Sequence, residues 1–319
     1  MIRSTLLALL LGLVVRATAA AQQRVAGPLV VFNAGSLAKP IREALQAFTA
    51  HHRDVRPAQE NSGSLEAARK LTELGKIPDL LAVADYGVIP KLLIPVHASW
   101  YALFARSEMV LAYSEGASGS GDITPDNWWR VLLRPGVRTG YSDPSLDPAG
   151  YRALMVYQLA ERYYGQPGLA NRLRAAVPAR YVRPKSADLV ALLQAGELDY
   201  AWEYEAVARQ RGLRYVAIPR EVNLGDPDLA ERYVLASARV PGAVQDADSV
   251  EIRGEPIVYA FTIPLRAAHP ATAAAFARFL VSPAGNAILR ANGFVPLATP
   301  RVAGPGTPPE GITGSRARD

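Results

Sequence analysis

Short apolar runs alternate with segments whose apolar residues recur every three or four positions, and this alternation continues along most of the chain. The run at residues 28–32 predicts a strand, followed by a helix with Pro40 near its start and Ile41, Leu45 and Phe48 on one face. Residues 64–74 predict a second helix, closed by Gly75, and residues 79–84 a buried strand. Strands that alternate with helices in this way predict an α/β fold.

Four of the predicted helices follow loops that end in Ser, Gly or Asp. These loops are residues 33–36, 61–64 and 140–147, together with Ser186 before a helix over 187–193. The helix after Asp147 has Pro148 at its first position and is expected to run to about residue 163. A later helix is expected to begin at Ser282–Pro283, and residues 199–204 predict a further strand.

Each such helix start exposes unpaired N–H groups and the positive end of a helix dipole, which together bind anions. Ordinary N-capping, a stabilisation of about 1 kcal/mol, explains any one of these starts taken alone. Several together favour an oxyanion site, particularly because Gly35 and Gly63 would let the backbone approach a ligand closely.

Composition narrows the class of protein. At about 150 residues per domain, the 319 residues predict two domains, and the 50% hydrophobic and 20% charged content is that of a soluble globular chain. The absence of cysteine excludes thiol catalysis, disulfides and cysteine metal sites. The net charge of +6 comes from scattered arginines without a basic stripe, so we expect no nucleic-acid partner.

The two ends of the chain have compositions of their own. Arg3, the apolar residues 5–15 and the small residues 17–21 predict a cleavable signal peptide over residues 1–21, because an apolar run of about 11 residues is too short to span a membrane. Without a cysteine to carry a lipid, the mature chain is expected in the periplasm with no lipid anchor. Residues 301–319 lack apolar periodicity and are expected to form a disordered tail.

An ordered series of motifs from about Leu29 to Leu297 resembles the molybdate/tungstate-binding proteins of ABC importers, especially the tungstate-type branch. The motifs are NAGSL at 33–37, SGS at 62–64, KLTELGK at 70–76, AVADY at 82–86, WYALFAR at 100–106, SDP at 142–144 with DP at 147–148, and YAWEY at 200–204. A single Gly-Ser would be weak support, whereas the series in this order is specific.

The resemblance implies a two-lobed, type II periplasmic-binding-protein fold, with mixed sheets flanked by helices and the ligand cleft between the lobes. Lobe 1 is expected to comprise residues 28–110 plus 264–300, and lobe 2 residues 111–263. The hinge crossings are expected near residues 109–113 and 258–263. Closure would be a hinge motion of the two lobes.

The resemblance also implies which residues hold the ligand. Ser36 and Ser64 match the hydroxyl and backbone donors of the family's first lobe, and Ala149 and Ala187 match the backbone N–H donors of its second. Asp147 and Glu203 match two carboxylates close to the oxyanion in the tungstate-type branch. Without the resemblance, Asp147 would be interpreted as an N-cap and Glu203 as the exposed end of a strand.

Carboxylates beside a dianion need a physical explanation, because two like charges about 4 Å apart repel by about 4 kcal/mol at an effective dielectric constant of 20. A hexavalent Mo or W centre can expand from four to six oxygen ligands, so Asp147 and Glu203 are expected to bind the metal directly. Sulfur and phosphorus do not expand readily, so the same pair would reject sulfate and phosphate.

We therefore expect a monomeric solute-binding protein that is not an enzyme and has no cofactor. It is expected to bind tungstate or molybdate and to dock on an ABC transporter permease. Alternatives are sulfate or phosphate as the ligand, ferric iron bound through Tyr163–Tyr164, and a carboxylate-pair glycoside hydrolase with Trp128–Trp129 as its sugar platform. Asp85, Tyr86 and Tyr204 are left outside the set of direct ligand contacts.

Overall fold

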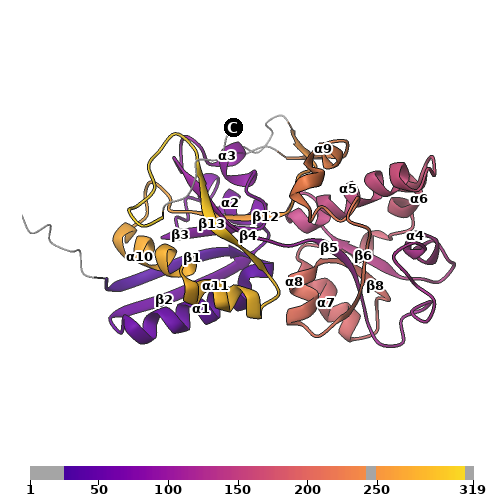
Figure 1. Cartoon of the computed structure of the whole chain (residues 1–319), viewed down its shortest axis with the longest axis horizontal. Coiled ribbons are helices and arrows are strands. Elements are labelled where there is room, and N and C mark those ends of the chain that lie inside the picture. The colour runs from indigo at the N-terminus through magenta and orange to yellow at the C-terminus, as the bar shows by residue number, and fades with distance from the viewer. Residues whose placement is uncertain (1–24, 242–248, 313–319) are drawn as a thin grey trace, which may run out of the picture.

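The computed structural model describes residues 25–241 and 249–312, and in this part of the chain two α/β lobes lie side by side (Figure 1). The predicted signal peptide and residues 313–319 of the predicted tail lie outside the described residues. Among the described residues, no helix has both the length and the apolar character needed to cross a membrane.

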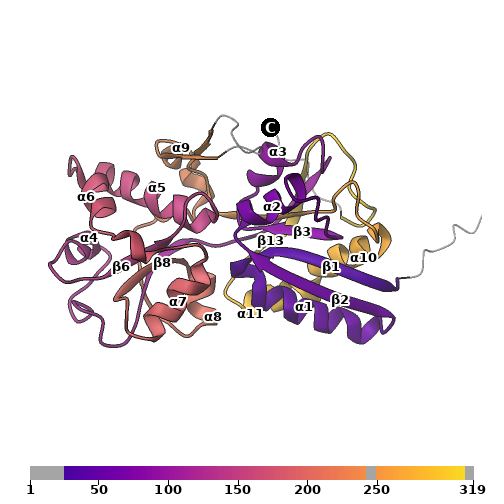
Figure 2. The same cartoon turned by 180° about the vertical axis from the view of Figure 1, so that it is seen from behind.

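The first lobe is built on a six-stranded mixed sheet of order β13-β4-β12-β3-β1-β2. Strands β1, β2 and β3 are parallel, and β12 and β13 are antiparallel to their neighbours. In both views α2 and α3 cover one side of the sheet, and α1, α10 and α11 cover the other (Figure 2). The bounds are β1 Gly27–Ala34, β2 Val55–Ser62, β3 Leu80–Val83, β4 Tyr101–Arg106, β12 Val258–Thr262, β13 Val295–Ala303, η1 Gly35–Leu37, α1 Ala38–His51, α2 Ser64–Thr72, α3 Val88–Leu92, α10 Pro270–Leu280 and α11 Pro283–Ala291.

The second lobe is built on a five-stranded sheet of order β7-β6-β8-β5-β9, with the hairpin-like sheet β10-β11 beside it. Its strands are β5 Met109–Tyr113, β6 Thr139–Ser142, β7 Val182–Arg183, β8 Tyr200–Tyr204, β9 Arg214–Ala217, β10 Ser237–Val240 and β11 Val250–Arg253. Its helices are α4 Trp128–Leu132, α5 Pro148–Tyr163, α6 Leu169–Ala175, η2 Ala179–Tyr181, α7 Ser186–Gln194, α8 Glu205–Gln210, η3 Pro227–Leu229 and α9 Ala230–Tyr233.

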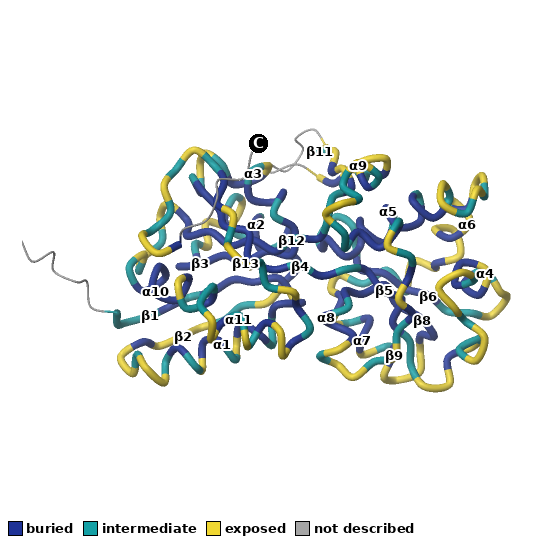
Figure 3. The backbone as a smooth tube through the Cα atoms, in the orientation of Figure 1, coloured by how far each residue is buried: buried dark blue, intermediate teal, exposed yellow. Residues whose placement is uncertain are grey.

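The elements that the sequence predicts are present in the structure, with small shifts at their ends. In α1 the buried residues include Ile41, Leu45 and Phe48, and the Phe48 ring packs edge-on against Phe276 of α10 with 5.4 Å between centroids. Helix α5 runs from Pro148 to Tyr163 as predicted. Buried residues follow the central strands of both sheets, so each lobe has its core there (Figure 3). Helix α2 ends at Thr72, two residues early, and leaves Leu74 exposed.

The crossings between the lobes differ from those expected. All of β5 pairs with β8 and β9 in the second sheet, and all of β12 pairs with β3 or β4 in the first sheet. The chain therefore passes between lobes at residues 107–108 and 254–257. The two crossings are joined to each other, because the N–H of Ser107 donates to the carbonyl of Ile257 at 3.3 Å.

The expectation of a disordered tail from residue 301 is wrong for residues 301–312. Residues 301–303 complete β13, which pairs with β4, and Val302, Ala303 and Ile312 are buried. The N–H of Gly306 donates to the carbonyl of Ser99 at 2.7 Å. Order here comes from backbone hydrogen bonds along the sheet edge, which need no apolar periodicity.

Candidate functional site

The starts of four helices meet where the lobes face each other. In lobe 1, η1 follows β1 and α2 follows β2; in lobe 2, α5 follows β6 after a short loop and α7 follows β7. Ligands of open α/β sheets bind outside the carboxyl ends of such strands. Each chain segment therefore delivers the start of a helix, with its unpaired N–H groups, to the same interface.

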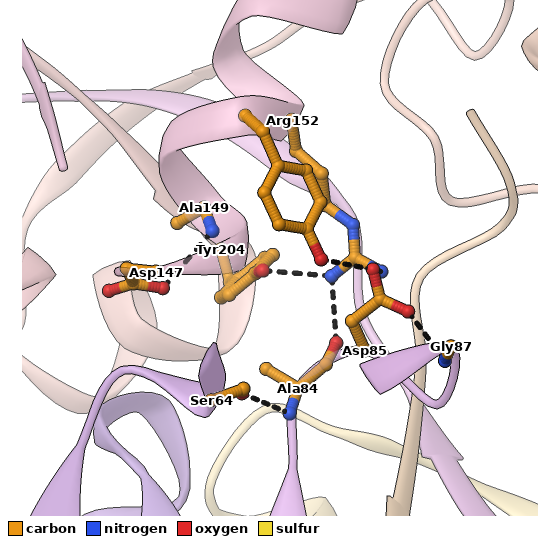
Figure 4. Close-up of polar contacts among 9 residues, drawn as sticks. Ser64, Ala84, Asp85, Gly87, Asp147, Ala149, Arg152 and Tyr204 are labelled. Atoms are coloured by element: carbon orange, nitrogen blue, oxygen red, sulfur yellow. Dashed lines mark hydrogen bonds and ion pairs between the residues drawn. The ribbon is translucent and has the colours of Figure 1, made fainter. Parts of the chain in front are cut away.

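The two serines predicted in lobe 1 are buried and already hydrogen-bonded. The hydroxyl of Ser36 accepts from the hydroxyl of Tyr259 at 3.1 Å. The hydroxyl of Ser64 accepts from the N–H of Ala84 at 2.9 Å (Figure 4). Ser64 is the first residue of α2, so its own N–H belongs to the unpaired set at that helix start.

Asp147 joins the starts of two helices in lobe 2. Its Oδ1 accepts from the N–H of Ala149 at 3.1 Å, and its Oδ2 accepts from the N–H of Ser186 at 3.4 Å. Asp147 is thus the N-cap of α5. Ser186 is the first residue of α7 and Lys185 is its N-cap, so this helix begins one position earlier than predicted. The Ala149 N–H, predicted as a ligand donor, here satisfies Asp147.

Glu203 on β8 is completely buried, and within residues 25–241 and 249–312 neither of its carboxylate oxygens has a hydrogen-bond partner. Burial, and next the charge of Asp147, raise the pKa of Glu203 well above its usual value. Ser186 and the Tyr204 backbone lie near enough to oppose this rise, but outside hydrogen-bond geometry. Burial also raises the pKa of Asp147, against its two backbone hydrogen bonds. The charges of the two buried carboxylates therefore repel each other.

A buried guanidinium connects the two lobes next to these carboxylates. Nη1 of Arg152, on α5, donates to the carbonyl of Ala84 at 2.7 Å and to the hydroxyl of Tyr204 at 2.8 Å. Its Nη2 lies 3.2 Å from Oδ2 of Asp85, which the hydroxyl of Tyr151 also contacts. Burial would lower the pKa of Arg152, but Tyr204 and Asp85 reverse this and raise it. Figure 4 shows Arg152 between Ala84, Asp85 and Tyr204.

Sequence reasoning missed Arg152. Its signal was an arginine among apolar residues in the first half of the helix, five positions after Asp147. The Asp-Pro motif at the helix start drew attention away from it. Sequence reasoning left Asp85 and Tyr204 outside the set of direct ligand contacts, and in the structure both contact Arg152. Tyr259, which bonds Ser36, carried no signal because it lies within an apolar strand.

Direct backbone contacts hold the lobes together around the site. A Cβ on Gly63 would lie 2.1 Å from the carbonyl oxygen of Leu146 in the opposite lobe. Arg69 of α2 donates to the carbonyls of Ser145 and Pro241, both at 2.9 Å. The structure is therefore that of closed lobes. Ala187 and Ser36, from opposite lobes, share the lining of a cavity of about 120 Å³.

The structure separates the alternative sites from this interface. Trp128 and Trp129 are buried, and Trp128 packs edge-on against Trp202 at 5.2 Å, so neither offers a sugar platform. The Tyr163–Tyr164 pair lies at the far end of the 16-residue helix α5 from Asp147, about 24 Å away at 1.5 Å per residue. The Tyr164 hydroxyl donates to the carbonyl of Pro125.

Comparisons with known proteins agree with this geometry. The sequence model of a family described as bacterial extracellular solute-binding protein matches residues 29–295. An uncharacterized solute-binding protein of Petrotoga mobilis is 41% identical, over 92% of this chain and 88% of that protein. The molybdate/tungstate-binding protein WtpA of Pyrococcus abyssi is 36% identical, over 90% of this chain and 89% of that protein.

Solved structures show the fold. The periplasmic molybdate-binding protein of Azotobacter vinelandii has a TM-score of 0.59 at 18% identity, covering 84% of this chain and 98% of that one. The sulfate-binding protein SubI of Mycobacterium tuberculosis has a TM-score of 0.59 at 14% identity, covering 85% and 87%. The expected type II periplasmic-binding-protein fold is confirmed.

Proposed function

The chain belongs to the family of bacterial extracellular solute-binding proteins, and we propose that its solute is tungstate or molybdate, which it delivers to the permease of an ABC importer. The observation that carries this proposal is Glu203, a buried carboxylate without a hydrogen-bond partner, held close to Asp147. The 36% identity to a molybdate/tungstate-binding relative supports it.

An ionised Glu203 destabilises the folded protein by itself, because a buried carboxylate loses its hydration and no hydrogen bond compensates for that loss. A hexavalent metal centre that accepts two further oxygen ligands would supply the missing partner. Asp147 and Glu203 would then become attractive contacts of the bound oxyanion. Sulfate and phosphate offer no such metal, so the carboxylates would repel them.

The remaining contacts would come from groups without charge. The hydroxyls of Ser36 and Ser64 and the N–H groups at the starts of α2, α5 and α7 converge from both lobes. Such donors stabilise an oxyanion without a full counter-charge. Ala187 would donate through its N–H, in the first turn of α7, and Ala149 would do so if Asp147 turns its Oδ1 to the metal.

Closure of the lobes would transmit ligand binding to the permease. Arg152 and Gly63 make their contacts across the interface only when the lobes are together. A ligand that bridges Ser36 and Glu203 would favour that arrangement, since it contacts both lobes. The proposal includes export by the predicted signal peptide at residues 1–21 and action as an unlipidated monomer.

Calorimetric titration of the purified mature protein tests the proposal. Tungstate and molybdate are expected to bind, and sulfate and phosphate are expected to give no comparable heat or affinity. The variants Glu203→Gln and Asp147→Asn keep side-chain size, and each is expected to weaken tungstate binding about 100-fold, equivalent to about 2.8 kcal/mol. The control Glu197→Gln changes an exposed carboxylate of the same lobe and is expected to bind as the wild type does.

Equal affinity for sulfate or phosphate would contradict the selectivity argument. Unchanged tungstate affinity in both Glu203→Gln and Asp147→Asn would contradict direct ligation. Turnover of a glycoside that is lost in the same two variants would instead favour the hydrolase alternative.

A further inference from the structure

A cavity of about 120 Å³ opens beside the buried site, between α1 of lobe 1 and α7 and α8 of lobe 2. Its lining includes Ser36, Ser186 and Ala187. Ser186 is the residue whose N–H donates to Asp147. The cavity therefore reaches from the molecular surface to the groups that hold the two carboxylates.

Three cationic side chains from both lobes also line this cavity: Lys39 and Arg42 of α1, and Arg211 after α8. Arg42 and Arg211 are exposed, and in the described part of the chain neither forms an ion pair within 4.0 Å. Lys39 lies 4.0 Å from Glu43, which also accepts from Asn292. Among the described residues, none that lines the cavity is acidic, and Asp188, the neighbour of Ala187, is not part of the lining.

We propose that Lys39, Arg42 and Arg211 form an anion-capture site at the mouth of the cleft, which attracts and first holds a small divalent oxyanion before it reaches Asp147 and Glu203. This inference rests on the proposed function, because it takes the same oxyanion as the ligand. It adds residues that determine the rate of capture.

The two carboxylates of the inner site explain why cationic residues at the entrance would help an oxyanion to bind. Two carboxylates repel an approaching dianion at long range, and their bonds to a metal centre form only at contact. The positive charges of Lys39, Arg42 and Arg211 make the electrostatic field at the entrance attractive to an oxyanion. Arg211 already acts at this range, since its charge partly opposes the rise in the pKa of Glu203. Charged clefts of this kind raise association rates by about 10- to 1000-fold.

Stopped-flow fluorescence with tungstate measures the capture step, with the four tryptophans of the chain as reporters. The test variant is Arg42→Gln/Arg211→Gln. The control Arg172→Gln/Arg266→Gln removes the same net charge from exposed positions, one in each lobe, outside the cavity. Salt is varied from about 0.01 M to about 1 M, over which the Debye length falls from about 30 Å to about 3 Å.

At low salt the test variant is expected to associate about tenfold more slowly than the control, with the difference gone at high salt and the dissociation rate changed by less than about twofold. Equal association rates for test and control variants at low salt would overturn the capture site while leaving the proposed function intact. A wild-type protein that binds none of tungstate, molybdate, sulfate and phosphate in calorimetry would overturn both.

Discussion

Glu203 differs from most buried acids because, in the part of the chain that the structure describes, no group hydrogen-bonds to its carboxylate. Asp147 has two backbone N–H donors, whereas both oxygens of Glu203 are without a partner. A side chain in that state weakens the folded protein unless it is protonated or bound to something. Its place in the closed lobes therefore argues for a function in binding.

Replacing Glu203 by Gln is expected to stabilise the ligand-free protein at neutral pH. The folded-state pKa of Glu203 is raised by burial, so the stability of the wild type is fully present below about pH 4.3 and falls as pH rises toward the raised value. Gln carries no charge at any pH. Thermal melting should show a Tm at least about 2 °C above that of the wild type at pH 8, and no difference at pH 4. A lower Tm at pH 8 would contradict this.

Glu255 gives a second pH dependence, in the crossing between β11 and β12. Burial, and then the charge of Asp85, raise the pKa of Glu255 to about 8. The protonated side chain is favoured in the folded state, so the free energy of unfolding is expected to fall as pH rises from about 4.3, the usual pKa of Glu, to about 8 and to level off above it. Glu255→Gln should remove that fall. Urea unfolding at pH 6 and pH 9 measures it, and equal slopes with pH in the two proteins would refute the assignment.

At the scale of elements, the central feature is the contact between the start of α2 and the loop before α5. Gly63 has φ −62° and ψ 149°, an extended conformation that any residue adopts, so a glycine is not required for the fold of lobe 1. The glycine is required for contact between the lobes, because the Leu146 carbonyl of lobe 2 occupies the space that a Cβ of residue 63 would fill.

Gly63→Ala is therefore expected to block closure and leave each lobe folded. A methyl group that would lie 2.1 Å from a backbone oxygen forces the lobes apart, so tungstate affinity should fall at least tenfold while the free energy of unfolding changes by about 1 kcal/mol or less. Calorimetry and urea unfolding measure the two effects. Gly121→Ala is the control, because a Cβ there meets nothing within 4 Å. Wild-type affinity in Gly63→Ala would mean that closure does not need this contact.

At the scale of the whole molecule, Arg152 links the two lobes at the site. Its contacts with Ala84 and Asp85 span the interface, while Tyr204 ties it to the strand that carries Glu203. In Asp85→Asn, the side-chain oxygen can still accept from Gly87, but the charge opposite Arg152 is lost. Closure should then be less favourable.

Small-angle X-ray scattering of ligand-free Asp85→Asn should show a larger radius of gyration than that of the wild type, and saturating tungstate should reduce the difference. Affinity is expected to fall about tenfold, in proportion to the lost closed fraction. Asp122→Asn removes the partner of Arg134 within lobe 2 and serves as the control. An unchanged radius in Asp85→Asn would contradict a role for this ion pair in closure.

The sequence predicted the parts of this molecule that depend on neighbours along the chain. Periodicity identified α1, and Asp147 before Pro148 marked the start of α5, which the structure confirms. Contacts between distant segments could not be predicted: Arg152 and Ala84 are 68 positions apart, and residues 301–303 gain their order from β4. The missing partners of Glu203 are likewise a property of the folded surroundings, which no local pattern encodes.

The most direct measurement is X-ray absorption at the tungsten L3 edge of the tungstate complex of the wild-type protein. If Asp147 and Glu203 bind the metal, the spectrum will show six oxygen neighbours in an octahedral arrangement, and the Asp147→Asn/Glu203→Gln variant will return it toward four. A tetrahedral centre with four oxygens in the wild-type complex would contradict the account.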